Sequence, residues 1–374
     1  PKPSSAASDV YKRQRNRLTA TERVPGRPAF RVGPISFVWR PRVLLVCLIA
    51  AALIVFLGAF SIGLGDFPIS VSRVLEVVFR GDGNRVERLV VLDWRMPRVA
   101  TAIAVGSALG LSGALTQTVT RNALASPDIL GITTGASAMA VTVIVLGGGS
   151  GFLSWLSGIG IPLAALLGAI LSATAIWALA WRRQADSYRL VLFGIIITAL
   201  LSSYINFLMI RSELRNATQA QFWLTGSLAT AGWNTTIPMV ILVIACCPLL
   251  AWIGYQALAT TLGPDLARAL GQRVNGVQVA MLALAVALAA VAVSAAGPIG
   301  FVAFVAPQVA LRMCGVPTPP LAASALTGAV LLLGADIVTQ AILPVELPVG
   351  IVTSALGGIF LIYLLVQRTR STDA

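Results

Sequence analysis

The sequence predicts an all-α, polytopic membrane protein with about ten transmembrane helices. Only 11% of its 374 residues are charged, whereas a soluble domain carries about 25% charged residues. Apolar runs of about 20 residues recur along the chain, and that is the length a helix needs to cross the hydrocarbon layer. Since no long polar stretch follows the N-terminal segment, we expect one membrane domain over residues 43–368.

The ten expected helices follow the apolar runs in order. They are expected near 43–63, 97–119, 128–147, 160–181, 189–210, 234–255, 275–296, 299–314, 320–341 and 348–367. The eighth is short and follows Gly297-Pro298, so we expect it to cross only part of the membrane. Broken helices are tolerated where they are packed in protein or line a wet cavity.

Positive charges predict the orientation. Residues 1–42 contain ten lysines and arginines against two acidic residues. Beside a membrane helix, this pattern marks the cytoplasmic side and anionic lipid rather than nucleic acid. The first outer loop, 64–96, balances five arginines with five acidic residues, while later inner loops keep an excess of arginine. We therefore expect both termini in the cytoplasm, with disordered tails at 1–42 and 369–374.

The first residues carry a feature of their own. Residues 5–14 read SAASDVYKRQ, which resembles the translation of a sequencing adapter. Residues 1–14 are therefore expected to contribute nothing to function.

Two connections are expected to form short helices outside the membrane, one at 212–233 on the outer side and one at 256–274 on the inner side. In the inner one, Pro264 and Asp265 suit a first helical turn and Gly271 suits its end. Its leucines recur on one helical face, namely Leu262, Leu266 and Leu270. Such a stripe either contacts a partner or covers the end of the bundle.

A small-residue stripe marks the second expected membrane helix. Gly106, Gly110, Gly113 and Gln117 follow at steps of four, three and four, which places them on one helical face. Small residues let another backbone approach closely in a membrane. The stripe therefore either packs this helix inside the chain or lines a path, and Gln117 would offer a polar group to a cavity.

Residue types narrow the chemistry. The only lysines are Lys2 and Lys12, so the membrane domain cannot contain the G-x-x-x-x-G-K-[ST] loop that holds nucleotide phosphates. The chain has no histidine, no G-x-S-x-G and no cluster of metal ligands, so no enzyme activity is expected. The four cysteines are expected to be packing residues. Asp336 is the main acidic candidate for ion coupling, and a structural carboxylate is the alternative.

A longer motif is more specific than the stripe. Residues 95–131 contain R-x-P-R, then G-x-x-L-x-x-S-G-x-x-x-Q, then R-N-x-L-A-x-P-x-x-L-G. This string resembles the signature of the iron-siderophore and cobalamin (FecCD-type) permeases of ABC importers. Further matches lie at 297–315, 324–336 and 346–365. The resemblance implies the type II ABC importer permease fold and a multi-pass place in the inner (cytoplasmic) membrane.

The resemblance also implies partners. It predicts a transport subunit that binds no cofactor itself, with ATP and Mg²⁺ on a partner ABC ATPase dimer. A second permease is expected, as a heterodimer rather than a homodimer, together with an extracytoplasmic siderophore-binding protein. The inner helix near 262–271 would be the coupling helix that contacts the ATPase, through Leu262, Gly263, Pro264, Asp265, Leu266, Leu270 and Gly271.

Docking residues follow from the same motif. Arg95 and Arg98 would pair with acidic groups of the binding protein, with interface anchoring as the alternative. A third arginine of the family pattern is Gln340 here, and this departure weakens the docking assignment on this side. The glycine stripe and Gln117 are the candidates for lining the translocation path.

The cargo is predicted from smaller details. Ala306-Pro307-Gln308 replaces the V-P-H of many relatives and resembles permeases for ferric enterobactin and related siderophores. We therefore expect a ferric siderophore, catecholate-like by preference, with cobalamin or haem as alternatives. A secondary carrier driven by an ion gradient and a membrane scaffold without transport are the alternatives from other classes.

Overall fold

A computed structural model describes residues 29–32, 35–38, 40–65, 67–147, 160–180, 187–260, 263–341 and 347–372. The chain divides into two units, Pro1–Leu45 and Val46–Ala374, and each is described by itself.

The first unit contains a short antiparallel hairpin. Strand β1 (Ala29–Val32) pairs with β2 (Ile35–Val38), with Ala29 opposite Val38 and Val32 opposite Ile35. Aromatic and β-branched residues are frequent in both strands, and such residues favour extended backbone. The hairpin differs from the disorder expected for residues 1–42, although residues 1–28 lie outside the described part.

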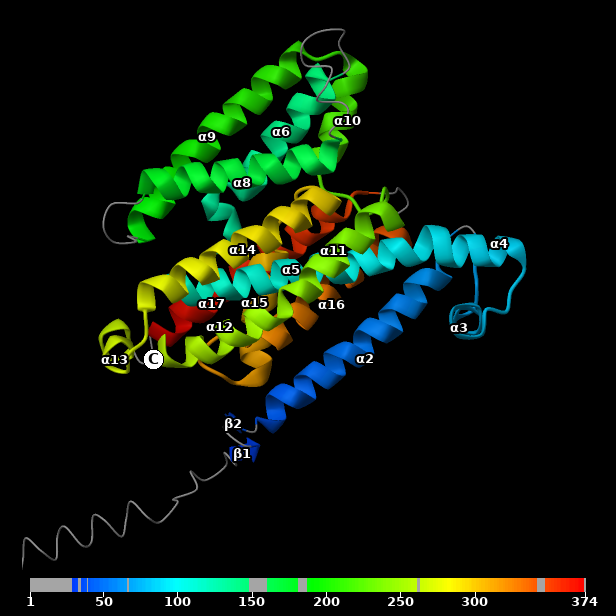
Figure 1. The fold of residues 1–374 in the computed structure, drawn as a ribbon. Helices are drawn as coiled ribbons and strands as arrows, with labels where there is room; N and C mark the ends of the chain where they lie inside the picture. Colours follow the sequence, from blue (N-terminus) through cyan, green and yellow to red (C-terminus); the bar gives the residue numbers. More distant parts are fainter. Residues whose placement is uncertain are drawn as a thin grey trace, which may run out of the picture. The chain divides into compact units, whose positions relative to one another are not determined.

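The second unit is a bundle of helices (Figure 1). In chain order the helices are α2 (Pro41–Gly63, which begins in the first unit), α3 (Val71–Arg80), α4 (Arg85–Arg88), the π-helix η1 (Leu89–Arg95), α5 (Met96–Thr120), the 3₁₀-helix η2 (Pro127–Leu130), α6 (Ile132–Leu146), α8 (Ile161–Ala180), α9 (Ser187–Arg211), α10 (Leu214–Leu224), α11 (Trp233–Ala245), α12 (Cys247–Thr260), α13 (Pro264–Ala269), α14 (Val274–Ala296), α15 (Val302–Cys314), α16 (Leu321–Ala341) and α17 (Val349–Thr372).

Every expected membrane segment contains a helix. Among the described residues, seven helices are long and apolar enough to cross a membrane, and three further apolar helices are shorter, at Ile132–Leu146, Val302–Cys314 and Val349–Leu364. The all-α membrane fold is confirmed, whereas the count of ten spans stays a prediction. The short helix expected after Gly297-Pro298 is α15, and the expected outer and inner surface helices are α10 and α13.

Two boundaries differ from expectation. The second span begins far earlier than residue 97, because α4, η1 and α5 form one continuous helical run of 36 residues from Arg85 to Thr120. The span expected at 234–255 is two helices, α11 and α12, which meet at Cys246. Pro248 explains that break, since proline has no N–H to donate to the carbonyl four residues earlier.

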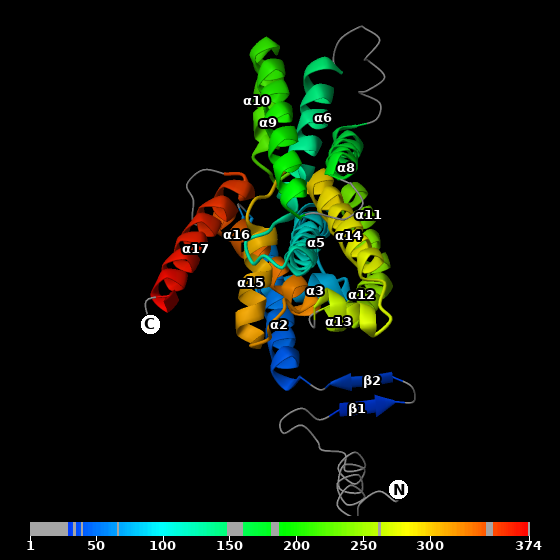
Figure 2. The same ribbon diagram turned by 90° about the vertical axis from the view of Figure 1, so that its left-hand side faces the viewer.

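Helix α5 is the centre of the bundle. It packs against α11, α14, α15 and α16, which surround it in both views (Figures 1 and 2). Helices α6, α8 and α9 pack on one another and join the rest chiefly where α8 lies along α14. About 83% of the apolar window of the α5 run is buried, against 6% for α9. The central helix is therefore protein-facing, while α9 presents most of its surface outward.

Glycines bring α5 and its neighbours into backbone contact. A Cβ added at Gly106 or Gly328 would overlap the main chain of the other, and one at Gly110 would overlap the Ser324 carbonyl. A Cβ at Gly113 would overlap the carbonyl of Ala303 in α15. Because Pro307 lacks an N–H, that carbonyl has lost its helical donor, and only a glycine can lie so close to it.

A second glycine junction joins three connections. Ser227 N–H donates to the Ala296 carbonyl, and Gly350 N–H donates to the Gly226 carbonyl. Gly226 and Gly297 have φ of 70° and 71°, values in the left-handed region that glycine adopts readily. The segments before α11, α15 and α17 therefore share one set of main-chain contacts.

The seam between α5 and α16 predicts a sharp contrast between two glycines. Gly328→Ala is expected to destabilise the chain by about 1–3 kcal/mol, because the new methyl group must push α5 away. Gly334→Ala, in the same helix, should be neutral or stabilising, since a Cβ there meets nothing within 4 Å. Unfolding of the two purified variants in mixed micelles measures the difference. Equal stabilities would contradict the assigned packing.

Candidate functional site

The candidate site lies along α5 and begins at the N-terminal end of that helix. Pro97 lies in the first turn and cannot donate a backbone hydrogen bond, and the residues before it form the π-helix η1. The wide turn offers the Leu92 carbonyl to a side chain, and the Trp233 indole N–H donates to it at 2.9 Å. The motif R-x-P-R thus places two arginines on either side of a modified helical turn.

Arg95 binds main-chain carbonyls. Its Nη1 donates to the Ile62 carbonyl at 2.8 Å and its Nη2 to the Phe67 carbonyl at 3.0 Å. The first of these carbonyls lies at the end of α2, where the last carbonyls of a helix lack intrahelical donors. Arg95 therefore ties the start of α5 to the end of α2.

Arg98 forms an ion pair with Asp336 of α16. Its Nε lies 3.2 and 3.1 Å from the two carboxylate oxygens, and its Nη2 lies 2.9 Å from Oδ1. The Asp336 side chain is fully buried, whereas the Arg98 side chain is 25% exposed. Gln340 Nε2 donates to the other oxygen, Oδ2, at 2.7 Å. Arginine and glutamine together satisfy the buried carboxylate.

This cluster joins three residues that the sequence treated separately. The sequence alone did not lead us to pair Asp336 with Arg98. The pair could have been expected, because a buried carboxylate in a membrane needs a cation at the same depth. Gln340 stands where the family pattern has arginine. It has a structural role, because its side chain donates a hydrogen bond to Asp336. Both arginines predicted to dock a binding protein are thus engaged inside the chain, and their docking role stays a prediction.

The glycine stripe lies in intrachain contacts. Gly106 and Gly110 face α16, and Gly113 faces α15. In this structure the three glycines therefore pack α5 against neighbouring helices of the same chain. Their role in lining a translocation path stays a prediction.

Gln117 continues the same face in a buried polar network. Its Nε2 donates to the Phe304 carbonyl at 3.1 Å, and its Oε1 accepts from Gln308 Nε2 at 2.7 Å. Arg312 Nη1 then donates to the Gln308 carbonyl at 2.9 Å and to its Oε1 at 3.1 Å. The Arg312 guanidinium also lies over the Phe360 ring, 5.9 Å from its centroid. From the sequence, Gln308 was recognised only as a difference from the family motif, and its hydrogen bond with Gln117 was not predicted.

The predicted coupling helix is α13. Pro264 lies in its first turn, and Gly263 and Gly271 flank it with φ of 104° and 83°. Leu266 and Leu270 are 51% and 65% exposed, while Ala267 is buried against the bundle. Leu266 and Leu270 therefore face outward rather than covering the end of the bundle. Leu262 and the side chain of Asp265 lie outside the described part.

Within the described residues, no group of three or more acidic, cysteine or histidine side chains is placed to hold a metal ion. The polar groups along α5 are instead paired with one another or with main chain. Together, the fold and these clusters define a multi-pass, α-helical membrane protein built around one long, glycine-lined helix, with a small exposed helix at one end.

The chain belongs to the FecCD transport family, whose sequence model matches residues 52–367. It is 38% identical over 330 residues to the ferric enterobactin transport system permease protein FepG of Escherichia coli (strain K12), covering 88% of this chain and 98% of that protein. It is also 38% identical to the achromobactin transport system permease protein CbrC of Dickeya dadantii (strain 3937), covering 86% and 90%. The iron(3+)-hydroxamate import system permease protein FhuG of Bacillus subtilis (strain 168) is 35% identical, with 87% and 97% covered.

A solved structure supports the fold. An inward-facing metal-chelate type ABC transporter superposes with a TM-score of 0.76 at 24% identity, covering 87% of this chain and 99% of that chain. The family and fold make this chain a permease of an ABC transporter in the inner (cytoplasmic) membrane. It is a transport subunit and not an enzyme, and ATP hydrolysis belongs to a separate subunit.

The ion pair near the N-terminal end of α5 yields a stability prediction. Arg98→Gln is expected to cost about 3 kcal/mol of unfolding free energy, because it leaves a buried carboxylate without a cation. Asp336→Asn in the same background should recover most of that loss. Unfolding in mixed micelles checks both changes.

The matched control is Arg73→Gln. Arg73 pairs with Glu76 and Glu87 but is 38% exposed, so its loss should cost no more than about 1 kcal/mol. If Arg98→Gln cost no more than the control, the ion pair would not stabilise the bundle.

Proposed function

We propose that this chain is the transmembrane permease subunit of an importer for ferric siderophores, with a catecholate of the enterobactin type favoured. The observation that carries the proposal is the 38% identity to the ferric enterobactin permease across 98% of that protein. The other relatives are named for achromobactin and for hydroxamate. They support an iron chelate as the class of cargo. The choice of a catecholate within that class rests on the ferric enterobactin permease alone.

The proposal includes four kinds of partner. A second permease, as a heterodimer in preference to a homodimer, would complete the path, an ABC ATPase dimer would hold ATP and Mg²⁺, and an extracytoplasmic binding protein would deliver the chelate. Membrane lipid surrounds the bundle. The outward face of α9, of which only 6% of the membrane-length window is buried, offers surface for the second permease.

We further propose the orientation and the domain limits expected from charge: cytoplasmic tails at 1–42 and 369–374 around a permease domain at 43–368. In that orientation α13 lies on the cytoplasmic side, where Leu266 and Leu270 would enter the ATPase. Arg95 and Arg98 lie on the outer side near the binding protein. The proposed lining of the path is the face of α5 that carries Gly106, Gly110, Gly113 and Gln117, and Gln117 is its polar group, with Gln308 and Arg312 beside it.

The structure weighs against the ion-coupled carrier. That mechanism needs a carboxylate that binds and releases an ion. Asp336 is fully buried, and its oxygens accept hydrogen bonds from Arg98 and Gln340. An acid held in this way suits a structural role better than a transport role.

Cargo is tested by uptake in cells that lack this chain. Labelled ferric enterobactin should no longer accumulate, while a ferric hydroxamate and cobalamin should enter as before through other systems. Loss of cobalamin uptake alone would keep the permease assignment and overturn the siderophore. Haem uptake, measured in parallel, tests the remaining alternative.

Coupling is tested by changing one exposed leucine. Leu266→Asp is expected to weaken association with the ATPase at least about tenfold and to abolish uptake, because a charge replaces an apolar contact at an interface centre. Folding should be unaffected, since the side chain is 51% exposed.

Leu214→Asp is the control, because Leu214 is 84% exposed on α10. It should leave ATPase association unchanged. Full association of the Leu266→Asp variant with the ATPase would exclude α13 from the interface, and would favour a scaffold without transport if uptake also continued.

A further inference from the structure

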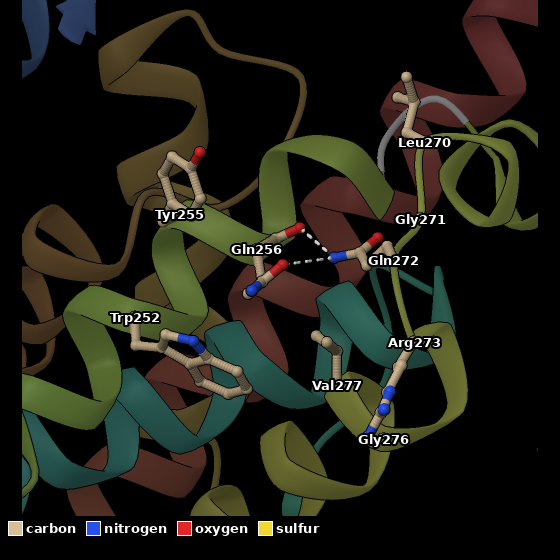
Figure 3. A pocket seen from close by; sticks show the side chains of 9 residues that line it. All are labelled: Trp252, Tyr255, Gln256, Leu270, Gly271, Gln272, Arg273, Gly276 and Val277. Carbon is tan, nitrogen blue, oxygen red and sulfur yellow. Dashed lines mark hydrogen bonds between the residues drawn. The ribbon is translucent and has the colours of Figure 1, made fainter. Parts of the chain in front are cut away.

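A hollow lies between α12 and the start of α14, next to α13. Its volume is about 800 Å³, within the range of about 300–1,000 Å³ typical of small-molecule sites. Trp252 and Gln256 line it from α12, and Gln272, Arg273 and Gly276 line it from the other side (Figure 3). None of these residues belongs to the clusters along α5.

Gln256 and Gln272 form one wall of the hollow and are joined by hydrogen bonds. Gln272 Nε2 donates to the Gln256 carbonyl at 2.7 Å and to the Gln256 Oε1 at 3.1 Å. These bonds fix the loop after α13 onto α12, as the dashed lines in Figure 3 show. Trp252, which is 45% exposed, points its ring from α12 toward the side where Val277 lies.

The other wall is suited to an anion. Arg273 is exposed, and its guanidinium has no hydrogen bond or ion pair with any described residue. Helix α14 begins directly after it without a side-chain cap, and the N–H groups of Asn275 and Gly276 donate to no other described residue. Open N–H groups and the helix dipole favour phosphate at a helix start.

Gly276 keeps this helical turn accessible. A Cβ added there would meet only the Arg273 Cβ, at 3.9 Å. A ligand oxygen can therefore approach the backbone of α14 beside the guanidinium.

Exposed apolar side chains continue from the hollow along α12. Only 17% of the membrane-length window of α11 and α12 is buried. Leu249 and Trp252 of α12 are three residues apart on one helical face and are 42% and 45% exposed. A ligand here would thus meet apolar side chains on α12 and positive charge at α14, and tryptophan and tyrosine are enriched where membrane meets water.

We infer that this hollow binds the headgroup of an anionic phospholipid, with its phosphate at Arg273 and the first turn of α14 and an acyl chain along α12. The bound lipid holds the loop that connects α13 to α14, and so steadies the helix proposed to contact the ATPase. The site itself requires only that the chain lies in a membrane. It does not depend on the proposed cargo.

The test counts lipids that stay bound to the purified, full-length permease. Native mass spectrometry after exchange into micelles with phosphatidylglycerol should show a retained phosphatidylglycerol. Arg273→Gln should weaken that binding about fivefold, the loss expected for one basic side chain at a lipid surface. Gly276→Leu should weaken it as well by filling the site, without removing a charge.

Arg189→Gln is the matched control, since it removes one positive charge at the start of another helix, and it should retain the lipid. Three results would overturn the inference. They are equal binding by Arg273→Gln and the control, equal retention of phosphatidylcholine, and displacement of the lipid by inorganic phosphate at millimolar concentration. Because lipid is counted without transport, failure here is distinct from failure of the proposed importer function.

Discussion

The approach of α5 to α15 and α16 without intervening side chains is the constraint on which the bundle depends. Helices in lipid gain little from the hydrophobic effect, so close packing and short polar contacts must hold them together. Gly106, Gly110 and Gly113 supply that approach. Short side chains can then reach a neighbouring backbone: Ser112, on the other side of α5, donates to the Ala285 carbonyl of α14 at 2.6 Å. A wider spacing would leave such groups unpaired in a medium without water.

Polar residues hold α5 at both ends of this tight middle. Arg98 and Asp336 join it to α16 at one end, and Gln117 and Gln308 join it to α15 at the other. Each buried polar side chain in these clusters has a partner, which offsets the cost of removing it from water. The glycine contacts set the distance between helices, and the polar pairs set their register along one another. Both features belong to the motif that distinguishes the chain in sequence.

Much of the fold could be predicted because hydrophobic length acts on each segment alone. The helix positions, the short α15 and the limits of α13, with Pro264 in its first turn and Gly271 just after its end, all follow from local patterns. Partners across the bundle could not be predicted, because Arg98 and Asp336 are 238 positions apart. The glycine stripe was ambiguous for the same reason, since one helical face does not say which surface covers it. The hollow at Arg273 carries no motif, because loop and helix geometry create it.

The junction of Gly226, Gly297 and Gly350 has a mechanical consequence. Connections between helices are usually mobile, because much of their backbone is bonded to water rather than to protein. Here the Ala296 and Gly226 carbonyls are bonded by neighbouring connections, so the three form one stiff joint. These bonds join the segment that follows α10 to the segments that precede α15 and α17. We therefore expect the helices to move during transport at breaks such as the one between α11 and α12 rather than at this junction.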